Sequence, residues 1–268
     1  MSVNRRFTQV AILILIGIAV AFPVRAPAFT NASLKGSFSF LTSLETANPS
    51  TNQFAMVGVL TFDGAGHVTG SFTSISQDTV VTGVLGGTYA VNSNGSGKIT
   101  FTTGSTAEFA ITLNSTAAGL AHGLQMLQIN DSKNEIISGT AVLQSTTTVT
   151  YSLANLKGTF TLQYNPHTAD GTLAEDGGVA VFTFDGKGGI KGSETTVFDG
   201  KVFTGSSPFT YTVNSDGTGT VSPTVKGPQI AFALNTVAGG LAKGLQFLDT
   251  NTSDGTGDLV ITGSALKQ

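Results

Sequence analysis

The chain has no cysteine, no tryptophan and few charged residues, and these absences exclude several classes of protein. Without cysteine there are no disulfides, no thiolate nucleophile and no cysteine-ligated metal. Charged residues make up 11% of the 268 residues, against about 25% in an average globular protein. Serine and threonine supply most of the surface polarity instead, and a neutral surface rich in glycine, serine and threonine is typical of extracellular β proteins.

Arginine is confined to the first 25 residues, in a segment with the pattern of a secretory signal peptide. Arg5 and Arg6 precede an apolar run from Ala11 to Phe22, and an Ala-Pro-Ala cleavage sequence ends at Ala28. The run is shorter than the roughly 20 residues that span a bilayer. We therefore predict a signal peptide over residues 1–28, export to the periplasm or the medium, and no integral membrane span afterwards. A retained membrane anchor is the alternative.

The mature chain would carry ten lysines, sixteen acidic residues and no arginine, a net charge of 10 − 16 = −6. Arginine is the side chain that most often binds phosphates and base edges, because its guanidinium group donates paired hydrogen bonds. A negative chain without a basic cluster is therefore not expected to bind nucleic acid or anionic lipid.

The mature chain consists of two copies of one internal repeat. The segment "LKGSFSF" returns as "LKGTFTL" 122 residues later, and "SGTAVLQ" returns as "TGSALKQ" 124 residues later. Each copy has the size of an independent small domain. We predict one domain over residues 29–146 and a second over residues 147–268.

Within each copy the hydrophobic pattern has the period of two that half-buried strands show. Phe109, Ile111 and Leu113 alternate with small or polar residues, as do Ile99 and Phe101, so we expect these side chains to point inward. Turn sequences such as "DGAG" and "NSNGSG" separate the apolar segments. The first copy predicts eight strands, at about residues 34–43, 53–62, 67–75, 79–91, 97–103, 107–114, 122–130 and 135–144.

Eight strands joined by short turns predict an antiparallel meander. Closing such a sheet removes its two exposed edges. An eight-stranded barrel has an interior that side chains can fill or that one small ligand can occupy. The predicted fold is all-β, with two tandem eight-stranded antiparallel up-and-down barrels, and two β-sandwiches are the alternative.

The order "LKGxF … TFDGxGxxxGS … TYxVNSxGxG … SGxAxxQ" resembles exported bacterial two-repeat proteins without an assigned activity. More distantly, the strand count and turn style are similar to those of calycin-type barrels, such as avidin and lipocalins, and of the allene oxide cyclase barrel. The tryptophans of the avidin biotin pocket have no counterpart here. No motif carries a cyclase site over to this chain.

The repeated "TFDG" segment places Asp63 and Asp185 at strand ends, followed by glycine. Aspartate accepts hydrogen bonds within its own turn, and glycine adopts positive φ freely. We predict hairpin turns at both places. Calcium prefers six to eight oxygens, and each loop offers one carboxylate, so calcium sites are not expected.

Neither copy carries a recognisable catalytic constellation. The chain has no G-x-S-x-G elbow, P-loop or dinucleotide fingerprint, and no paired carboxylates that both copies share. The histidines are not shared between the copies either; they are His67, His122 and His167. We predict no catalytic residues, no metal site and no cofactor.

Polar residues that both copies keep inside predicted strands are the candidates for ligand binding. Gln125 and Gln246 lie in "GLQML" and "GLQFL", and Tyr89 and Tyr211 precede the "VNS" turns. The alternative is structural, with glutamines facing solvent or backbone and tyrosines packed with the hydroxyl at the barrel rim.

The leading functional hypothesis is an exported, non-catalytic binding or cell-envelope interaction module. Its partner would be a small apolar ligand or an envelope component. The alternatives are a cyclase- or isomerase-type enzyme for a hydrophobic substrate and a purely structural envelope protein. A cavity of a few hundred Å³ favours binding or catalysis, whereas an interior filled by phenylalanines favours the structural role.

Overall fold

The computed structural model describes most of the chain after the predicted leader. The predicted signal peptide lies outside the described residues except for Ala28. The described residues are 28–45, 54–76, 79–114, 116–117, 119–130, 136–168, 177–198, 201–206, 208–224, 229–250 and 259–268.

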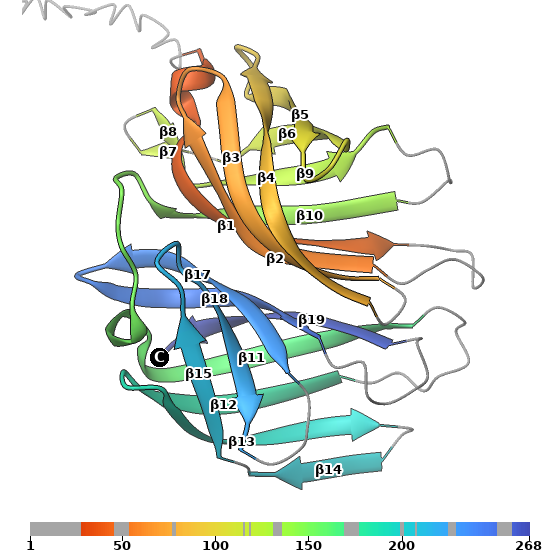
Figure 1. The fold of residues 1–268 in the computed structure, drawn as a ribbon, viewed down its shortest axis with the longest axis vertical. Helices are drawn as coiled ribbons and strands as arrows, with labels where there is room; N and C mark the ends of the chain where they lie inside the picture. Colours follow the sequence, from red (N-terminus) through yellow and green to blue (C-terminus); the bar gives the residue numbers. More distant parts are fainter. Residues whose placement is uncertain are drawn as a thin grey trace, which may run out of the picture.

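The first copy forms a closed barrel of eight antiparallel strands, which we call barrel 1 (Figure 1). Around the barrel the order is β1-β10-β9-β6-β5-β4-β3-β2, and a two-stranded pair, β7 (Thr116–Ala117) and β8 (Leu120–Ala121), lies outside it. The eight predicted strands are confirmed, with every boundary within two residues. They are β1 (Lys35–Glu45), β2 (Phe54–Asp63), β3 (His67–Ser76), β4 (Thr79–Val91), β5 (Ser96–Thr103), β6 (Glu108–Leu113), β9 (Gly123–Gln128) and β10 (Ile136–Ser145).

The second copy, barrel 2, closes in the same way through the pairing of β12 with β13. It differs at one place: the single strand β4 is replaced by two short strands, β14 and β15, and β14 pairs with the outer half of β13. The prediction of two tandem barrels is thereby confirmed over two sandwiches. The strands are β11 (Lys157–Thr168), β12 (Gly177–Asp185), β13 (Gly189–Phe198), β14 (Lys201–Gly205), β15 (Phe209–Val213), β16 (Thr218–Pro223), β17 (Ile230–Ala238), β18 (Leu241–Asp249) and β19 (Leu259–Lys267).

The alternating residues of barrel 1 point as predicted. Phe101, Phe109 and Ile111 are buried in the barrel core, and Leu113 packs against that core. Thr112, between two of them, is exposed. Period-two alternation therefore sorts the side chains into interior and exterior sets.

The Asp-Gly segments form the predicted turns. Asp63 Oδ1 accepts hydrogen bonds from the backbone N–H groups of Ala65, Gly66 and His67 at 2.6, 2.9 and 3.0 Å. Asp185 Oδ1 accepts two equivalent bonds in barrel 2. These backbone donors hold the pKa of both carboxyl groups below the usual range.

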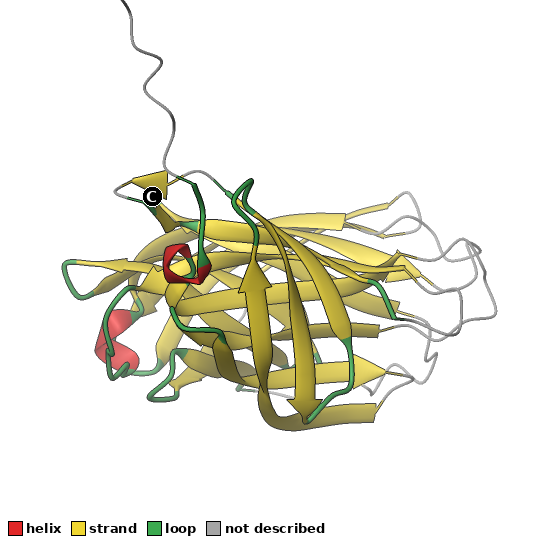
Figure 2. Cartoon of the chain, turned by 90° about the horizontal axis from the view of Figure 1, so that it is seen from above, coloured by secondary structure: helices red, strands yellow, loops and turns green. Residues whose placement is uncertain are grey.

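Each barrel is sealed at one end by a short 3-10 helix and a tyrosine. The helices η1 (Asn31–Ser33) and η2 (Leu153–Asn155) lie on the same side of the molecule (Figure 2). The Tyr89 hydroxyl donates to the backbone oxygen of Leu34 at 2.8 Å, and the Tyr211 hydroxyl donates to that of Leu156 at 2.8 Å. The same end is therefore closed in both barrels by the same contacts.

The two barrels pack through the outer faces of their sheets, as Figure 1 shows for β1 and β2 against β17 and β18. The buried apolar side chains of this barrel–barrel interface come from β2 and β3 of barrel 1 and from β17, β18 and β19 of barrel 2. They are Ala55, Val57, Val59, Ile75, Ala231, Ala233, Leu248 and Val260.

Candidate functional site

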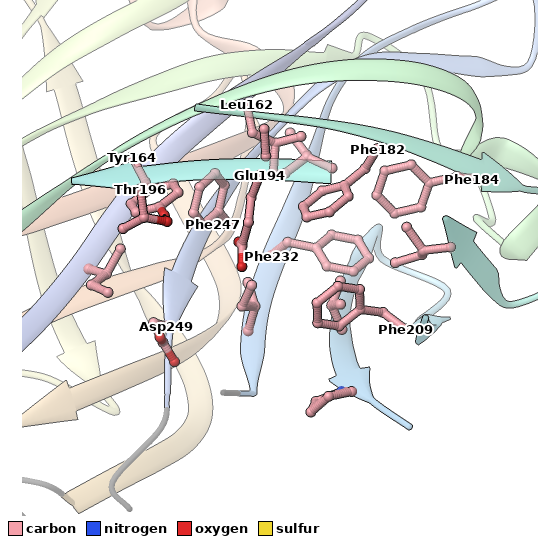
Figure 3. A pocket seen from close by; sticks show the side chains of 17 residues that line it. Leu162, Tyr164, Phe182, Phe184, Glu194, Thr196, Phe209, Phe232, Phe247 and Asp249 are labelled. Carbon is pink, nitrogen blue, oxygen red and sulfur yellow. The ribbon is translucent and has the colours of Figure 1, made fainter. Parts of the chain in front are cut away.

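Barrel 2 contains a cavity of about 320 Å³ that reaches toward the end opposite η2. Its wall is mainly apolar and takes side chains from β11, β12, β13, β15, β16, β17, β18 and β19 (Figure 3). The volume is at the lower end of the range of about 300–1,000 Å³ for ligand pockets. The principal lining residues are Leu162, Tyr164, Phe182, Phe184, Glu194, Thr196, Phe209, Phe232, Phe247 and Asp249.

The two barrels place phenylalanines at different positions of the same interior. Barrel 1 is occupied by Phe40, Phe101 and Phe109, each at most 3% exposed. The matched residues in barrel 2 are Leu162, Pro223 and Ile230, and all three line the cavity. In the reverse direction, barrel 2 has Phe182, Phe209, Phe232 and Phe247 in the cavity wall where barrel 1 has Leu60, Gly87, Ile111 and Met126. The cavity of barrel 2 therefore accompanies a rearrangement of the rings and not a net loss of phenylalanine.

The most distinctive exchange replaces Phe72 of barrel 1 with Glu194 of barrel 2. Phe72 packs against the core of its barrel. Glu194 has the same inward register on β13 and is partly buried in the cavity wall. In Figure 3 its side chain extends between Phe247 and Phe232. Within the described part of the chain, its carboxylate has no hydrogen-bond or ion-pair partner.

Two other polar features lie in the same wall. The Tyr164 hydroxyl and the Thr196 Oγ1 are hydrogen-bonded at 2.6 Å, with either oxygen able to donate. Asp249 lies at the end of β18 and adds a second carboxylate. Among the described lining residues there is no lysine, arginine or histidine, so the charge of this wall is negative.

The aromatic rings of the wall are held by contacts with one another. Phe182 and Phe209 meet edge to face with ring centroids 5.6 Å apart, and Phe184 packs in the same manner on Phe160 and Tyr211. Such rings have electron-rich faces that attract cations. The wall therefore suits an apolar body that carries a positive or strongly donating group.

The structure separates the two predicted glutamines into different environments. Gln125 on β9 is exposed on the outside of barrel 1. Gln246 on β18 is 4% exposed and lies in the barrel–barrel interface, where its Nε2 donates to Thr140 Oγ1 at 3.0 Å. Neither lines the cavity, and their role in ligand binding stays a prediction.

The predicted tyrosines lie at the sealed ends of their barrels. Tyr89 and Tyr211 are both at most 5% exposed, and each packs edge to face on a phenylalanine at 5.1 or 5.2 Å. Burial raises the pKa of Tyr89 to about 12. Neither tyrosine is part of the cavity wall, so their role in ligand binding also stays a prediction.

The residue that sequence reasoning missed is Glu194. The signal was present, because Glu194 stands 122 residues after Phe72 at an inward position of the same strand. An acidic residue matched to an inward phenylalanine marks a polar group in an otherwise apolar interior. Glu194 is not among the polar residues that both copies share, because barrel 1 has a phenylalanine at this position.

Two further observations concern metal binding and membrane-spanning helices among the described residues. No group of three or more histidine, aspartate or glutamate side chains is placed to hold a metal ion within them. In the same part of the chain, no helix has the length and apolar character needed to cross a membrane.

No protein-family model and no curated protein matches the sequence. Among solved structures, a protein of unknown function from the DUF3598 family of Nostoc punctiforme is 13% identical, with a TM-score of 0.29, over 87% of this chain and 96% of that one. A point mutant of transferrin-binding protein B from Haemophilus parasuis is 10% identical, with a TM-score of 0.24, over 91% and 77% of the two chains. A porin-like protein from Bacteroides uniformis is 11% identical, with a TM-score of 0.22, over 87% and 97%.

These low TM-scores carry no argument about function. The resemblances to exported repeat proteins and to calycin-type barrels stay predictions.

Proposed function

We propose that barrel 2 binds a small, largely apolar molecule that carries a protonated amine, and that barrel 1 is its filled, structural companion. The observation that carries this proposal is Glu194, a carboxylate without a partner among the described residues, set among phenylalanines in a cavity of about 320 Å³. A charged group in apolar surroundings is costly unless an opposite charge or a donor pairs with it. A bound ammonium group would supply both.

The rest of the wall supports the same ligand class. Phe232 and Phe247 flank Glu194 and offer ring faces to a cation. The wall holds the carboxylates of Glu194 and Asp249 and, among its described residues, no lysine, arginine or histidine. A negative wall favours the entry of a cation over that of an anion.

The experiment measures binding of three probes that share one apolar body. 2-Phenylethylamine carries the ammonium group, 2-phenylethanol a neutral hydroxyl, and 3-phenylpropionate a carboxylate. We expect calorimetry to rank the amine first, the alcohol second and the carboxylate last. An equal affinity for all three would contradict the role of Glu194.

Two variants separate the charge from the cavity. Glu194→Gln keeps the shape, so the amine should lose about tenfold in affinity or more while the alcohol is unaffected. Glu194→Phe reproduces the residue of barrel 1, so all probes should lose binding. Glu108→Gln in barrel 1 is the matched control, because Glu108 lies outside the cavity and pairs with Lys98 at 3.1 Å. It should change nothing.

A cyclase- or isomerase-type enzyme is the second candidate function. A carboxylate in an apolar cavity is the arrangement that general bases use on carbon acids. The hydrophobic wall would hold the substrate in one conformation. Turnover of a ligand identified by the binding experiment, abolished in Glu194→Gln with binding of the neutral analogue retained, would favour the enzyme over the binding module.

The proposal includes export. Its support is the leader pattern, in which an apolar run follows Arg5 and Arg6 and ends before Ala28. Protein recovered from the periplasm or the medium should begin at Phe29 by N-terminal sequencing. Recovery of the full-length chain with the membrane fraction would instead support a retained anchor.

A further inference from the structure

Each side of the barrel–barrel interface has an exposed counterpart on the other barrel. Because the two copies match residue by residue, each interface residue of barrel 1 has an equivalent on barrel 2, and the reverse also holds. The equivalents of the interface of barrel 1 lie on β11, β12, β13 and β19, which we call the groove face. The equivalents of the interface of barrel 2 lie on β6, β9 and β10, which we call the ridge face.

The groove face keeps the apolar character of the surface it matches. Val57, Val59 and Ile75 are at most 3% exposed in the interface. Their equivalents 122 residues later are Val179, Val181 and Val197, which are 58%, 41% and 40% exposed. Free apolar side chains gathered on one sheet face mark an interaction surface.

The groove face is also hollowed. A shallow groove of about 500 Å³ runs along it and is lined by Val179, Val181 and Leu266 together with uncharged polar residues. No charged residue belongs to the described lining. On barrel 1 the matching surface is covered by β17 and β18 of barrel 2.

The ridge face carries the complementary set. Leu248 and Val260 of barrel 2 are at most 3% exposed in the interface, and their equivalents on barrel 1 are Leu127 and Ile136, 45% and 55% exposed. Of the twelve large apolar side chains that are exposed in the described residues, six lie on the groove and ridge faces. They are Val179, Val181, Val197, Leu266, Leu127 and Ile136.

The polar contacts of the interface are preserved in the same way. Gln246 donates to Thr140 across the interface at 3.0 Å. Their equivalents are Gln125 on the ridge face and Ser264 on the groove face, and both are exposed. A glutamine and a hydroxyl are thus kept at both positions.

Two further polar pairs follow the same rule. Ser39 donates to the Asn235 side chain, and the equivalents of these residues are Thr161 and Asn114. Ser71 donates to Asp216, and the equivalents are Ser193 and Asn94. All four equivalent residues are exposed, and each pair still combines a hydroxyl with a carbonyl-type acceptor.

We infer that the groove face of one molecule binds the ridge face of a second copy of this chain, in the geometry that barrel 1 and barrel 2 already share. The groove and ridge faces are different surfaces, so the contact is head-to-tail and either extends to a filament or closes to a ring. In Figure 1, β12 and β13 lie at the end of barrel 2 away from barrel 1, and β6 and β9 lie on barrel 1 beyond β10, which itself contacts β17.

Sedimentation velocity at protein concentrations from about 1 µM to about 1 mM tests self-association with dissociation constants in that range. The native chain should form dimers and larger species as its concentration rises. Val181→Asp removes the groove face and Leu127→Asp removes the ridge face, and each variant alone should remain monomeric. Val84→Asp is the matched control, because Val84 is 64% exposed outside both faces; it should associate like the native chain.

Mixing the two blocked variants gives the decisive result. Val181→Asp retains an intact ridge face, and Leu127→Asp retains an intact groove face. The mixture should therefore form a one-to-one dimer and nothing larger. Circular dichroism and thermal melting confirm that each variant is folded before mixing.

A crosslink locates the contact. The chain has no cysteine, so Gln125→Cys and Ser264→Cys, placed in separate molecules, should be joined by a short thiol crosslinker. Thr140→Cys with Gln246→Cys in one molecule is the positive control for the geometry. Adding Leu127→Asp to the Gln125→Cys chain should abolish the intermolecular product. A monomer at every concentration, or a mixture of blocked variants that stays monomeric, would overturn the inference.

Discussion

Barrel 1 and barrel 2 have the same strand topology and the same sealed end, but they differ in what fills the other end. At the sealed end, the distance from the tyrosine hydroxyl to the helix-flanking carbonyl is 2.8 Å in both barrels. Toward the open end, barrel 1 has Phe72, and barrel 2 has Glu194 and a cavity of about 320 Å³.

The difference shows how a duplicated barrel acquires a site. Closure of the sheet and the packing of the sealed end are structural requirements, and both copies retain the residues that meet them. The part of the interior away from the sealed end tolerates change, because an eight-stranded barrel has room there for either side chains or a ligand. In barrel 2 the rings are redistributed around a cavity, and the carboxylates of Glu194 and Asp249 give that cavity a chemical preference.

The largest effect should come from removing a ring in the filled barrel. Phe109→Ala should destabilise the chain by about 3–5 kcal/mol, because it leaves a void in a closely packed core. The matched change in barrel 2, Ile230→Ala, should cost less than about 2 kcal/mol, because Ile230 already borders a cavity. Denaturant unfolding of both variants measures the contrast, and equal losses would mean that barrel 2 is packed like barrel 1.

The second test exchanges the residues that distinguish the two interiors. Phe72→Glu should destabilise barrel 1 by about 2–4 kcal/mol, since it removes apolar burial and introduces an unpaired charge. Glu194→Phe should stabilise barrel 2, by about 1–2 kcal/mol, because it fills space and removes such a charge. Thermal unfolding checks the opposite signs. A destabilising Glu194→Phe would show that the cavity has no room for the ring.

A smaller and equal effect is expected at the sealed ends. Tyr89→Phe and Tyr211→Phe should each cost about 1–2 kcal/mol, because a buried carbonyl loses its donor. Burial raises the pKa of Tyr89 from 10.0 to about 12. The stabilisation is therefore complete below pH 10 and is lost as the pH rises toward 12. Between pH 10 and pH 12, the free energy of unfolding should fall less steeply with pH in Tyr89→Phe than in the native chain. Clearly unequal losses at pH 7 would contradict equivalent ends.

The smallest effect should come from the Asp-Gly turns. The backbone N–H groups of His67 and Ala65 lower the pKa of Asp63, and those of Gly189 and Lys187 lower the pKa of Asp185. Their contribution to stability is complete above the pKa of an unfolded aspartate, about 4, and is lost as the pH falls through the lower folded pKa. Asp63→Asn and Asp185→Asn should change the free energy of unfolding little at pH 7. They should also reduce its fall with pH below about pH 4.

Calcium provides the contrast for this prediction. Because each turn offers one carboxylate, added calcium should not raise the melting temperature of the native chain. A rise of several degrees that both asparagine variants abolish would identify the turns as ion sites.

The sequence was sufficient for the fold because local and long-range signals agree. Alternation at Phe109 and Ile111, turn residues at Asp63, and the need to close the sheet all predict the same barrel. The break between β14 and β15 was not predicted, although Pro208 precedes β15 and cannot donate to a ladder hydrogen bond.

The candidate site was less predictable, since a cavity depends on the summed volumes of residues from eight strands. No single residue indicates it, and the exchanges of Phe40 for Leu162 and of Phe109 for Ile230 each look conservative by themselves. The glutamines illustrate the same limit. Gln125 and Gln246 lie in nearly the same local sequence, GLQML and GLQFL, but packing of the two barrels buries only Gln246.

Xenon bound to crystals under pressure tests most directly whether one barrel is filled and the other hollow. Xenon enters apolar cavities without needing a charged partner, so the result does not depend on the proposed ligand. We predict a xenon atom in barrel 2 among Phe182, Phe232 and Phe247, no xenon inside barrel 1, and loss of the bound atom in Glu194→Phe. Equal xenon occupancy in both barrels, or none in barrel 2, would contradict the account.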